Sequence, residues 1–338
     1  MGFVTCEDTQ DQTTTRPNTL FDDADDIQRQ LDNEARDKII FGKPKTVWVF
    51  RLPTEFPQGS TKPWSRYTRN FKKFQCRKKT KLVKNSTLVP KDWCYNDQNQ
   101  WYKVYPQCGG RSQSPVDLPT LGLVKAKGRH LRFINYDVLP RRLTLSKNGK
   151  QIILYGEWEY HHQPLVYGGA AHSRRYVFHS MILHYHSEHS IGGLQYPLET
   201  QVLHISAEFK TLEEALASSS RDHQALLGIV NLYKFKNHTH RGLEEFLNVG
   251  YRSLGINTSM TPRALSYFNP PFKEYVCYQG SLTYPPCTET VLWLVRGRAL
   301  PITREIITLA ATLFDDGEKG SFIRQPQPLN DRKVFYFN

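Results

Sequence analysis

The sequence has no long hydrophobic run, and this absence argues against a membrane-spanning helix. Such a helix needs roughly 18 consecutive apolar residues, whereas the apolar stretches here are short pieces such as residues 291–295. The first residues lack both an Arg-rich amphipathic pattern and a basic start followed by an apolar stretch, so no transit peptide or cleavable signal peptide is visible. Hydrophobic residues still make up 39 % of the 338-residue chain, enough for a substantial core.

Cysteine is scarce and never forms a CxxC pair, which argues against a disulfide-dense scaffold and against a common structural zinc motif. Composition alone leaves the redox compartment open. Three Asn-x-Ser/Thr sequences, at Asn85, Asn237 and Asn257, match N-glycosylation acceptors. Their number is near chance for this length, so the sequence gives them little weight. The six cysteines are Cys6, Cys76, Cys94, Cys108, Cys277 and Cys287.

The net charge of +13 is unevenly distributed, and its distribution divides the chain into three parts. Residues 1–42 hold four Lys/Arg and ten Asp/Glu, whereas residues 43–90 hold thirteen Lys/Arg and one acid, Glu55. In the acidic part, apolar residues at three- and four-residue spacing predict an amphipathic helix capped by Asp22 or Asp23. We expect its apolar stripe to bind a protein partner. The stripe consists of Ala24, Ile27, Leu31, Ala35 and Ile39.

Residues 43–90 combine basic side chains with aromatic ones, and three interpretations remain open: a protein-binding strap, a nucleic-acid contact, and a disordered or targeting segment. A strap that lies over a protein surface would bury the aromatic rings and leave the charges in solvent or against an acidic partner. Single-stranded nucleic acid would use the same combination for stacking and phosphate contacts, centred on Arg77, Lys78 and Lys79. We favour the protein-binding strap, which would tie the chain into a larger assembly.

Residues 91–338 form the third part, where short runs of alternating polarity predict a mainly β domain. Examples are residues 142–145, 151–155 and 176–185, which are separated by Gly, Pro and Asn. Helical pattern occurs only in pieces, at residues 211–218 and 242–249. We see no internal repeat.

This third part resembles the alpha-carbonic anhydrases along most of its length. The matching segments occur in that family's order: Trp93-Cys94-Tyr95 with Trp101, residues 108–118 with their Gln-Ser-Pro sequence, Asn148-Gly149-Lys150, Leu227-Gly228-Ile229, residues 278–287, and Trp293. The resemblance implies a large, mostly antiparallel twisted sheet with short peripheral helices. It also implies a zinc ion on three strand histidines, whose bound water attacks carbon dioxide.

The resemblance also indicates a degenerate zinc site. Within residues 199–204 the family's third ligand position is occupied by Gln201, whose amide is a weaker zinc ligand than imidazole. Two alignments of the first strand remain open. The ungapped one, which we favour, places Ile182 and His184 at the first two ligand positions. The other places His184 and His186 there, so that zinc, if bound, would be held by His184, His186 and Gln201.

Some other positions of the vestigial site match the family, and others differ from it. Thr283 and Glu188 match the family's hydroxyl-orienting pair, although a buried hydrogen-bonded pair kept for stability explains them at least as well. Lys150 matches the proton-shuttle position, where a lysine is a poor proton relay at neutral pH. Tyr284 is bulkier than the family's threonine.

The resemblance further implies a disulfide between Cys108 and Cys287, which pair in exported members of the family. A bridge there would indicate an oxidising or organellar compartment, and we favour a mitochondrial one. Cys94 and Cys277 would form a second bridge or remain buried thiols.

We therefore predict a catalytically inactive carbonic-anhydrase-like protein, without a cofactor, that serves as a structural or interaction subunit among other protein subunits. An active zinc carbonic anhydrase is the first alternative, and a nucleic-acid-contacting subunit is the second.

Overall fold

The computed structural model of the chain describes residues 93–338, apart from residues 127–129, 149, 254–255 and 315–321. The predicted amphipathic helix and the strap at residues 43–90 lie outside these described residues. Within them, a 13-stranded sheet is the main element, and a three-stranded sheet accompanies it.

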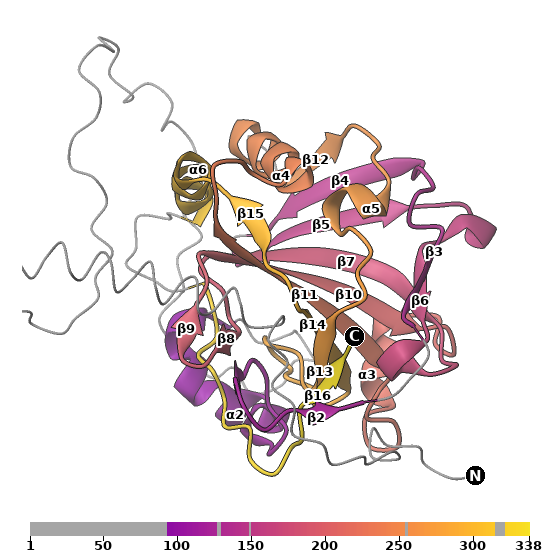
Figure 1. The fold of residues 1–338 in the computed structure, drawn as a ribbon, viewed down its shortest axis with the longest axis vertical. Helices are drawn as coiled ribbons and strands as arrows, with labels where there is room; N and C mark the ends of the chain where they lie inside the picture. Colours follow the sequence, from indigo (N-terminus) through magenta and orange to yellow (C-terminus); the bar gives the residue numbers. More distant parts are fainter. Residues whose placement is uncertain (1–92, 127–129, 149, 254–255, 315–321) are drawn as a thin grey trace, which may run out of the picture. The chain divides into compact units, whose positions relative to one another are not determined.

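The large sheet contains β2 (Val124–Lys125), β3 (Arg132–Ile134), β4 (Arg142–Lys147), β5 (Ile152–Glu157), β6 (Leu165–Tyr167), β7 (Tyr176–His184), β10 (Leu198–Ser206), β11 (Leu226–Phe235), β12 (Asn257–Met260), β13 (Tyr275–Gly280), β14 (Val291–Arg296), β15 (Leu300–Ile302) and β16 (Phe335–Phe337). Its strand order is β12-β4-β5-β7-β10-β11-β14-β13-β16-β2, with β15 beside β11 and with β6 between β3 and β7 (Figure 1). The small sheet contains β1 (Asp117–Leu118), β8 (Ser190–Ile191) and β9 (Leu194–Gln195).

Most neighbouring strands are antiparallel. The parallel pairs among the described strands are β11 with β14, β11 with β15, β16 with β2, and β1 with β8. The three strands predicted at residues 142–145, 151–155 and 176–185 are observed as β4, β5 and β7. The mainly β, mostly antiparallel fold expected from the resemblance is therefore confirmed.

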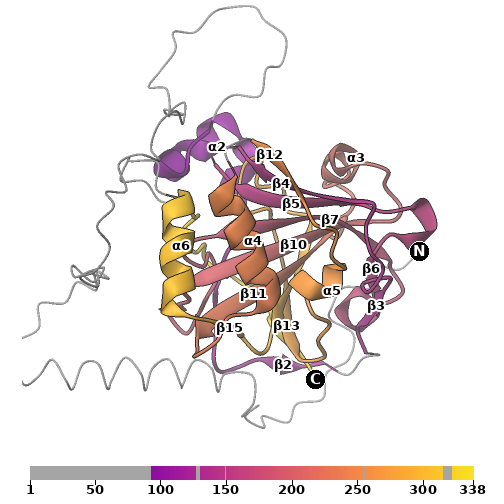
Figure 2. The same cartoon turned by 90° about the horizontal axis from the view of Figure 1, so that it is seen from above.

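Helices are short and lie at the periphery of the sheet. Thr211 caps α3 by accepting a hydrogen bond from the Glu214 backbone N–H on its side-chain oxygen, and Glu213 and Glu214 suit the positive end of the helix dipole. Figure 2 shows α4 and α6 side by side on one face of the sheet. The helices are α2 (Trp101–Val104), α3 (Leu212–Ala217), α4 (Arg241–Arg252), α5 (Leu265–Phe268) and α6 (Arg304–Phe314), with 3-10 turns η2 (Tyr95–Gln100), η3 (Pro106–Gly109), η4 (Tyr160–His162) and η5 (Gly169–Ala171).

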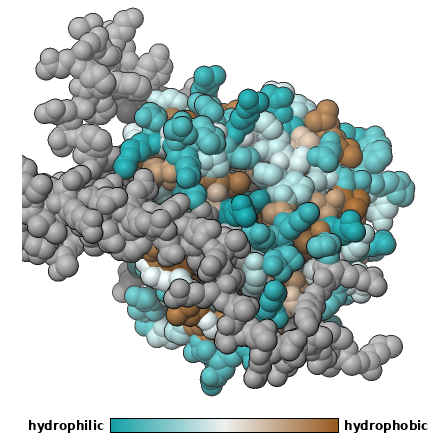
Figure 3. Space-filling model, viewed as in Figure 1, coloured by the Kyte–Doolittle hydropathy of each residue, from teal (hydrophilic) through white to brown (hydrophobic). Residues whose placement is uncertain are grey.

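The core runs through the middle of the large sheet. Almost every residue of β10 and β11 is buried, including polar ones such as Glu199, Gln201 and Asn231. On the face seen in Figure 3, the described residues form a mosaic of polar and apolar side chains. No helix of the described part is long and apolar enough to cross a membrane. The buried polar residues need hydrogen-bond partners, and these partners define the candidate site.

Candidate functional site

Two neighbouring strands, β7 and β10, carry four residues of the central cluster, by which we mean Ile182, His184, Glu188, Glu199, Gln201 and Thr283. Gln201 of β10 lies opposite Ile182 of β7, and Glu199 lies opposite His184. Ile153 of β5 lies on the other side of Ile182. Residues directly opposite one another, and alternate residues of one strand, share a face of a sheet. The four strand residues of the cluster therefore project toward the same side.

The side-chain amide of Gln201 forms hydrogen bonds with three neighbouring side chains. Its Nε2 donates to Glu188 Oε2 and to Glu199 Oε1, both at 2.8 Å. Its Oε1 accepts a hydrogen bond from Thr283 Oγ1 at 3.3 Å. A glutamine has two N–H donors, so neither remains for another ligand.

Glu199 is held ionised within this buried setting. Its Oε2 accepts from the backbone N–H groups of Glu188 and His189, and the His189 ring contacts Oε1 at 2.8 Å. Burial by itself would raise the pKa of Glu199, but the charge and hydrogen bonds of His189 lower it to about 2. Gln201 therefore donates to a carboxylate that carries its charge.

The pKa of Glu188 is shifted in the opposite direction from that of Glu199. Its Oε1 accepts the backbone N–H of Arg324 at 2.8 Å, and its Oε2 accepts from Gln201. Burial is the largest influence and raises the pKa of Glu188, and the nearby Glu199 charge adds to this effect. The Thr283–Glu188 pair of the sequence analysis is thus part of a buried network that includes Gln201.

His184 is the one imidazole at a strand position of the cluster. It is 1 % exposed, and its Nδ1 lies 3.6 Å from Glu188 Oε1. Its Nε2 is buried and has no hydrogen-bond partner among the described residues. This nitrogen is one atom of the cluster that could face a ligand.

His186 and Ile182 differ from His184 in what they can supply. Strand β7 ends at His184, so strand alternation does not carry His186 to the face of the cluster. The His186 ring stacks on Tyr185, with 4.3 Å between ring centroids, and burial lowers its pKa. Ile182 lies opposite Gln201 but offers only hydrocarbon.

An aromatic stack brings Lys150 and Tyr284 together. The Trp93 and Tyr284 rings lie 6.3 Å apart and nearly parallel, and Lys150 Nζ lies 4.9 Å from the Trp93 ring centroid. Burial raises the pKa of the Tyr284 phenol, and the neighbouring Tyr155 and Glu188 raise it further. The bulk of Tyr284 is therefore packed between Trp93 and the surroundings of Glu188. The sequence analysis did not foresee this stack.

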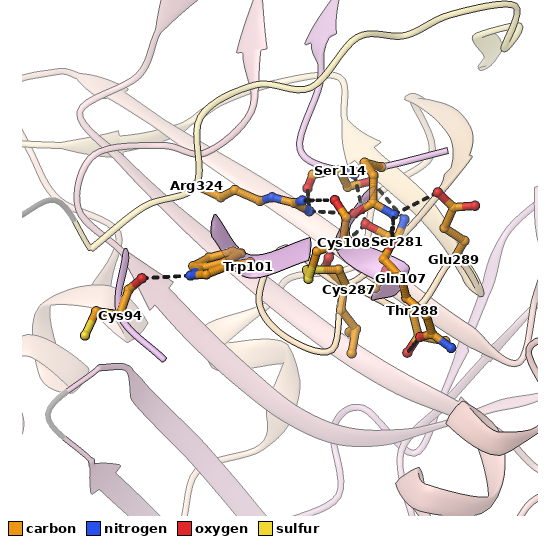
Figure 4. Close-up of a disulfide and its surroundings, with 12 residues drawn as sticks. Cys94, Trp101, Gln107, Cys108, Ser114, Ser281, Cys287, Thr288, Glu289 and Arg324 are labelled. Carbon is orange, nitrogen blue, oxygen red and sulfur yellow. Dashed lines mark hydrogen bonds between the residues drawn. A yellow bond between two sulfur atoms is a disulfide. The ribbon is translucent and has the colours of Figure 1, made fainter. Parts of the chain in front are cut away.

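The predicted disulfide is present and secures the loop that carries Thr283 and Tyr284. Cys108 of η3 and Cys287 are joined at an Sγ–Sγ distance of 2.06 Å (Figure 4). Cys277 is buried in β13 and takes no part in a disulfide, whereas Cys94 is disulfide-bonded. The predicted bridge between Cys94 and Cys277 is therefore not formed, and the alternative of a Cys94 thiol is wrong as well.

Arg324 links this disulfide region to the central cluster, and sequence reasoning missed it. Its guanidinium donates to Gln113 Oε1 and to the carbonyl oxygens of Ser114 and Cys108 (Figure 4), while its backbone N–H donates to Glu188. Burial lowers the pKa of Arg324 to about 10. Only its exclusion from solvent distinguishes it from a surface arginine, and no sequence pattern signals that exclusion.

A zinc ion would find an incomplete donor set here. Zinc sites take three protein ligands plus water, or four protein ligands. The strand positions offer one imidazole nitrogen, one amide oxygen that accepts from Thr283, and the hydrocarbon of Ile182. Across the described ranges, no group of three or more His, Cys, Asp or Glu side chains is placed to hold a metal. The residues therefore do not fit zinc.

Comparisons with known proteins identify the architecture. A family model described as eukaryotic-type carbonic anhydrase matches residues 96–338. Human carbonic anhydrase 3 is 27 % identical over 261 residues, which cover 73 % of this chain and 98 % of that protein. The putative carbonic anhydrase 5 of Caenorhabditis elegans is 30 % identical over 259 residues, covering 72 % of this chain and 81 % of the relative. Mouse carbonic anhydrase 6 is 25 % identical over 266 residues, covering 72 % and 80 % respectively.

Proposed function

Because the chain belongs to the eukaryotic-type carbonic anhydrase family, we propose that it is a non-catalytic member, whose domain serves as a rigid interaction module rather than as a carbon dioxide hydratase. The family assignment supplies the fold. It does not supply the chemistry, because function depends on the residues of the site and not on the fold that carries them.

The observation that carries the proposal is the engagement of Gln201. A zinc ligand at this position must turn a lone pair toward the metal while a second-shell partner orients it. Gln201 donates both N–H groups to buried carboxylates and receives the Thr283 hydroxyl on its oxygen. The Thr283 hydroxyl uses one of the two lone pairs of that oxygen, and Ile182 leaves the site one ligand short in any case.

Two further features support the proposal. Lys150 occupies the position that the resemblance assigns to the proton shuttle, and it lies over the Trp93 ring. A protonated lysine does not pass protons efficiently at neutral pH. Tyr284 fills space beside Glu188 with a phenol ring where the resemblance places a threonine. Proton transfer and substrate access are therefore altered together with the metal site.

The test is a metal count combined with a hydration assay. The full chain is equilibrated with excess zinc, dialysed, and analysed for zinc per chain, with a conventional carbonic anhydrase as the positive control. We expect far less than one zinc per chain and no hydration above the buffer rate. Stoichiometric zinc together with acetazolamide-sensitive hydration would refute the proposal.

The second candidate function is hydration by zinc held on His184, His186 and Gln201. The buried, unpartnered Nε2 of His184 favours it, because such an atom suits a metal or another ligand. This candidate requires His186 to join His184 from beyond the end of β7. Replacing His186 with alanine would then abolish zinc binding, whereas the non-catalytic proposal expects no change in the metal count.

The role within an assembly rests on the sequence of the extension. Its acidic first part and basic, aromatic second part suit docking onto protein subunits, and the disulfide of the domain indicates an oxidising compartment. Removal of residues 1–90 should abolish co-purification of partner subunits while leaving the domain folded. If residues 43–90 bind nucleic acid instead, association should weaken steeply with salt and be lost when Arg77, Lys78 and Lys79 are neutralised.

A further inference from the structure

Two N-glycosylation acceptor sequences lie within the described residues, and neither has a role in the central cluster. They are Asn237-His238-Thr239 and Asn257-Thr258-Ser259. The third acceptor sequence, at Asn85, lies outside the described residues. Sequence alone gives such matches little weight, because they arise by chance. A glycan is bulky and must project into solvent, so the fold itself tests each match.

Asn257 is exposed to solvent because of its position in a strand. It begins β12, in which Asn257 and Ser259 are exposed while Met260 is buried. Alternate residues of a strand face the same side, so the asparagine and the hydroxyl residue of this acceptor sequence both face solvent. The neighbouring Ile256 is 57 % exposed. An attached sugar would therefore meet no packed core.

The position of β12 adds a reason for a glycan at this place. β12 is the last strand in the order of the large sheet and pairs with β4 alone among the described strands (Figure 1). An open strand edge can pair with other chains, and proteins commonly obstruct such edges. A glycan on Asn257 would block this edge sterically.

Asn237 passes the test in a loop. It is exposed between β11 and α4, and its Oδ1 contacts His238 Nδ1 at 3.0 Å. Its Nδ2, the atom that would carry a sugar, makes no hydrogen bond to another described residue. Thr239 is tied down instead, since its Oγ1 accepts the backbone N–H of Thr303. The asparagine therefore points outward from an anchored loop.

The disulfide supplies the argument about compartment. Cys108 and Cys287 are bonded, which requires an oxidising space. The mitochondrial space favoured from the sequence and the secretory lumen both meet that requirement. Only the secretory lumen also contains the machinery that glycosylates asparagine. The two exposed acceptor sequences and the disulfide, taken together, favour the secretory lumen.

We propose that Asn237 and Asn257 carry N-linked glycans, and that the protein matures in a secretory lumen. In each transfer the asparagine Nδ2 forms a bond to the first sugar carbon of a lipid-diphosphate-linked oligosaccharide. The bond between that carbon and the diphosphate oxygen breaks, the lipid diphosphate leaves, and Nδ2 gives up one proton. The host transferase catalyses this step, and no oxidant or reductant is consumed.

The experiment begins with full-length protein isolated from its own cells. Digestion with a peptide N-glycosidase should lower the mass by two oligosaccharides and convert Asn237 and Asn257 to aspartate, which peptide mass spectrometry locates. Unchanged mass and unmodified asparagines would overturn the proposal and support a mitochondrial location. A single modified site would overturn it for the other asparagine.

Variants expressed in the same cells separate the glycan from the side chain. Ser259→Ala destroys the acceptor sequence but keeps Asn257, whereas Ser259→Thr preserves it, so only the first should lose one glycan. Asn237→Gln should lose the other glycan, and Thr239→Ser should retain it. Equal masses for Ser259→Ala and Ser259→Thr would contradict glycosylation of Asn257. Zinc content does not enter this measurement, so its result is independent of the proposed function.

Discussion

At the scale of single residues, Gln201 stabilises the buried carboxylates that surround the family's third ligand position. Its two N–H groups satisfy Glu188 and Glu199, both buried, and leaving a buried charged acceptor unsatisfied costs several kcal/mol. The amide therefore preserves the network around the site. The oxygen of the amide, the atom that a metal would bind, accepts a hydrogen bond from Thr283.

A first prediction concerns positions 182 and 201, where the proposed function places an isoleucine and an amide instead of zinc-binding imidazoles. Ile182→His combined with Gln201→His would supply two imidazoles beside His184, and we expect the double variant to bind about one zinc per chain. Gln201→His alone should not, because Ile182 would still leave the set incomplete. Elemental analysis after dialysis measures the difference.

The matched control adds His184→Ala to the double variant, which should lose the metal again. A double variant that folds but remains metal-free would show that the geometry of β7 and β10, and not the ligand types, prevents binding. We expect little hydration from the double variant in either case, since Lys150 and Tyr284 remain.

A second prediction concerns acid and Glu199. The pKa of Glu199 is about 2 in the folded chain and about 4.3 for an unperturbed glutamate. A lowered folded pKa contributes stability that is present above about pH 4.3 and is lost as pH falls toward 2. The contribution is on the order of 3 kcal/mol.

Urea unfolding of the wild type and of Glu199→Gln between pH 7 and pH 2 measures this contribution. The wild type should be the more stable chain at neutral pH, and the two should converge as Glu199 becomes protonated. A difference that stays constant over this range would mean that the charge of Glu199 does not stabilise the fold.

At the scale of elements, strands were predictable where polarity alternates or where a run is apolar, as for β4, β5 and β7. The structure places Ile182 opposite Gln201, and the choice between the two alignments of this strand stays a prediction. The contacts of Arg324 and the stack of Trp93 on Tyr284 were not predictable. Each joins segments that lie far apart in the sequence, and their meeting depends on tertiary packing rather than on local pattern.

A third prediction concerns the disulfide between η3 and the loop after Thr283. The bridge spans 179 residues of sequence, and closing a loop of that length restricts the unfolded chain strongly. Replacing both cysteines by serine should lower the free energy of unfolding by roughly 2 to 5 kcal/mol, measured by urea denaturation.

Reducing agent should destabilise the wild type at least as much, and it should destabilise the double serine variant less, because in that variant only the disulfide that contains Cys94 remains to be reduced among the described cysteines. Cys277→Ala is the matched control, because its thiol is buried in β13 outside the bridge. That variant should remain sensitive to reducing agent. Insensitivity of the wild type would indicate that the bridge contributes little to stability.

At the scale of the whole molecule, the described fold is built around a sheet core of buried apolar side chains. The central strands bury apolar residues on β7, β10, β11 and β14, and several of the polar residues between them hydrogen-bond one another. Burial of apolar area is the main favourable term in folding. A chain with this core can lose a metal ligand and keep its shape, which is the condition for a catalytic fold to become an interaction surface.

The fourth prediction concerns the effect of zinc on thermal stability. A ligand that binds the folded state at 100 times its dissociation constant adds about 2.7 kcal/mol, which corresponds to roughly 5 to 10 °C in Tm for a domain of this size. We expect excess zinc, with or without a sulfonamide, to leave the Tm of this protein unchanged, while the Tm of the Ile182→His, Gln201→His variant rises. Differential scanning calorimetry records both. A wild-type Tm that rises and saturates near one equivalent of zinc would show that the chain still forms a metal site, and would contradict the proposed function.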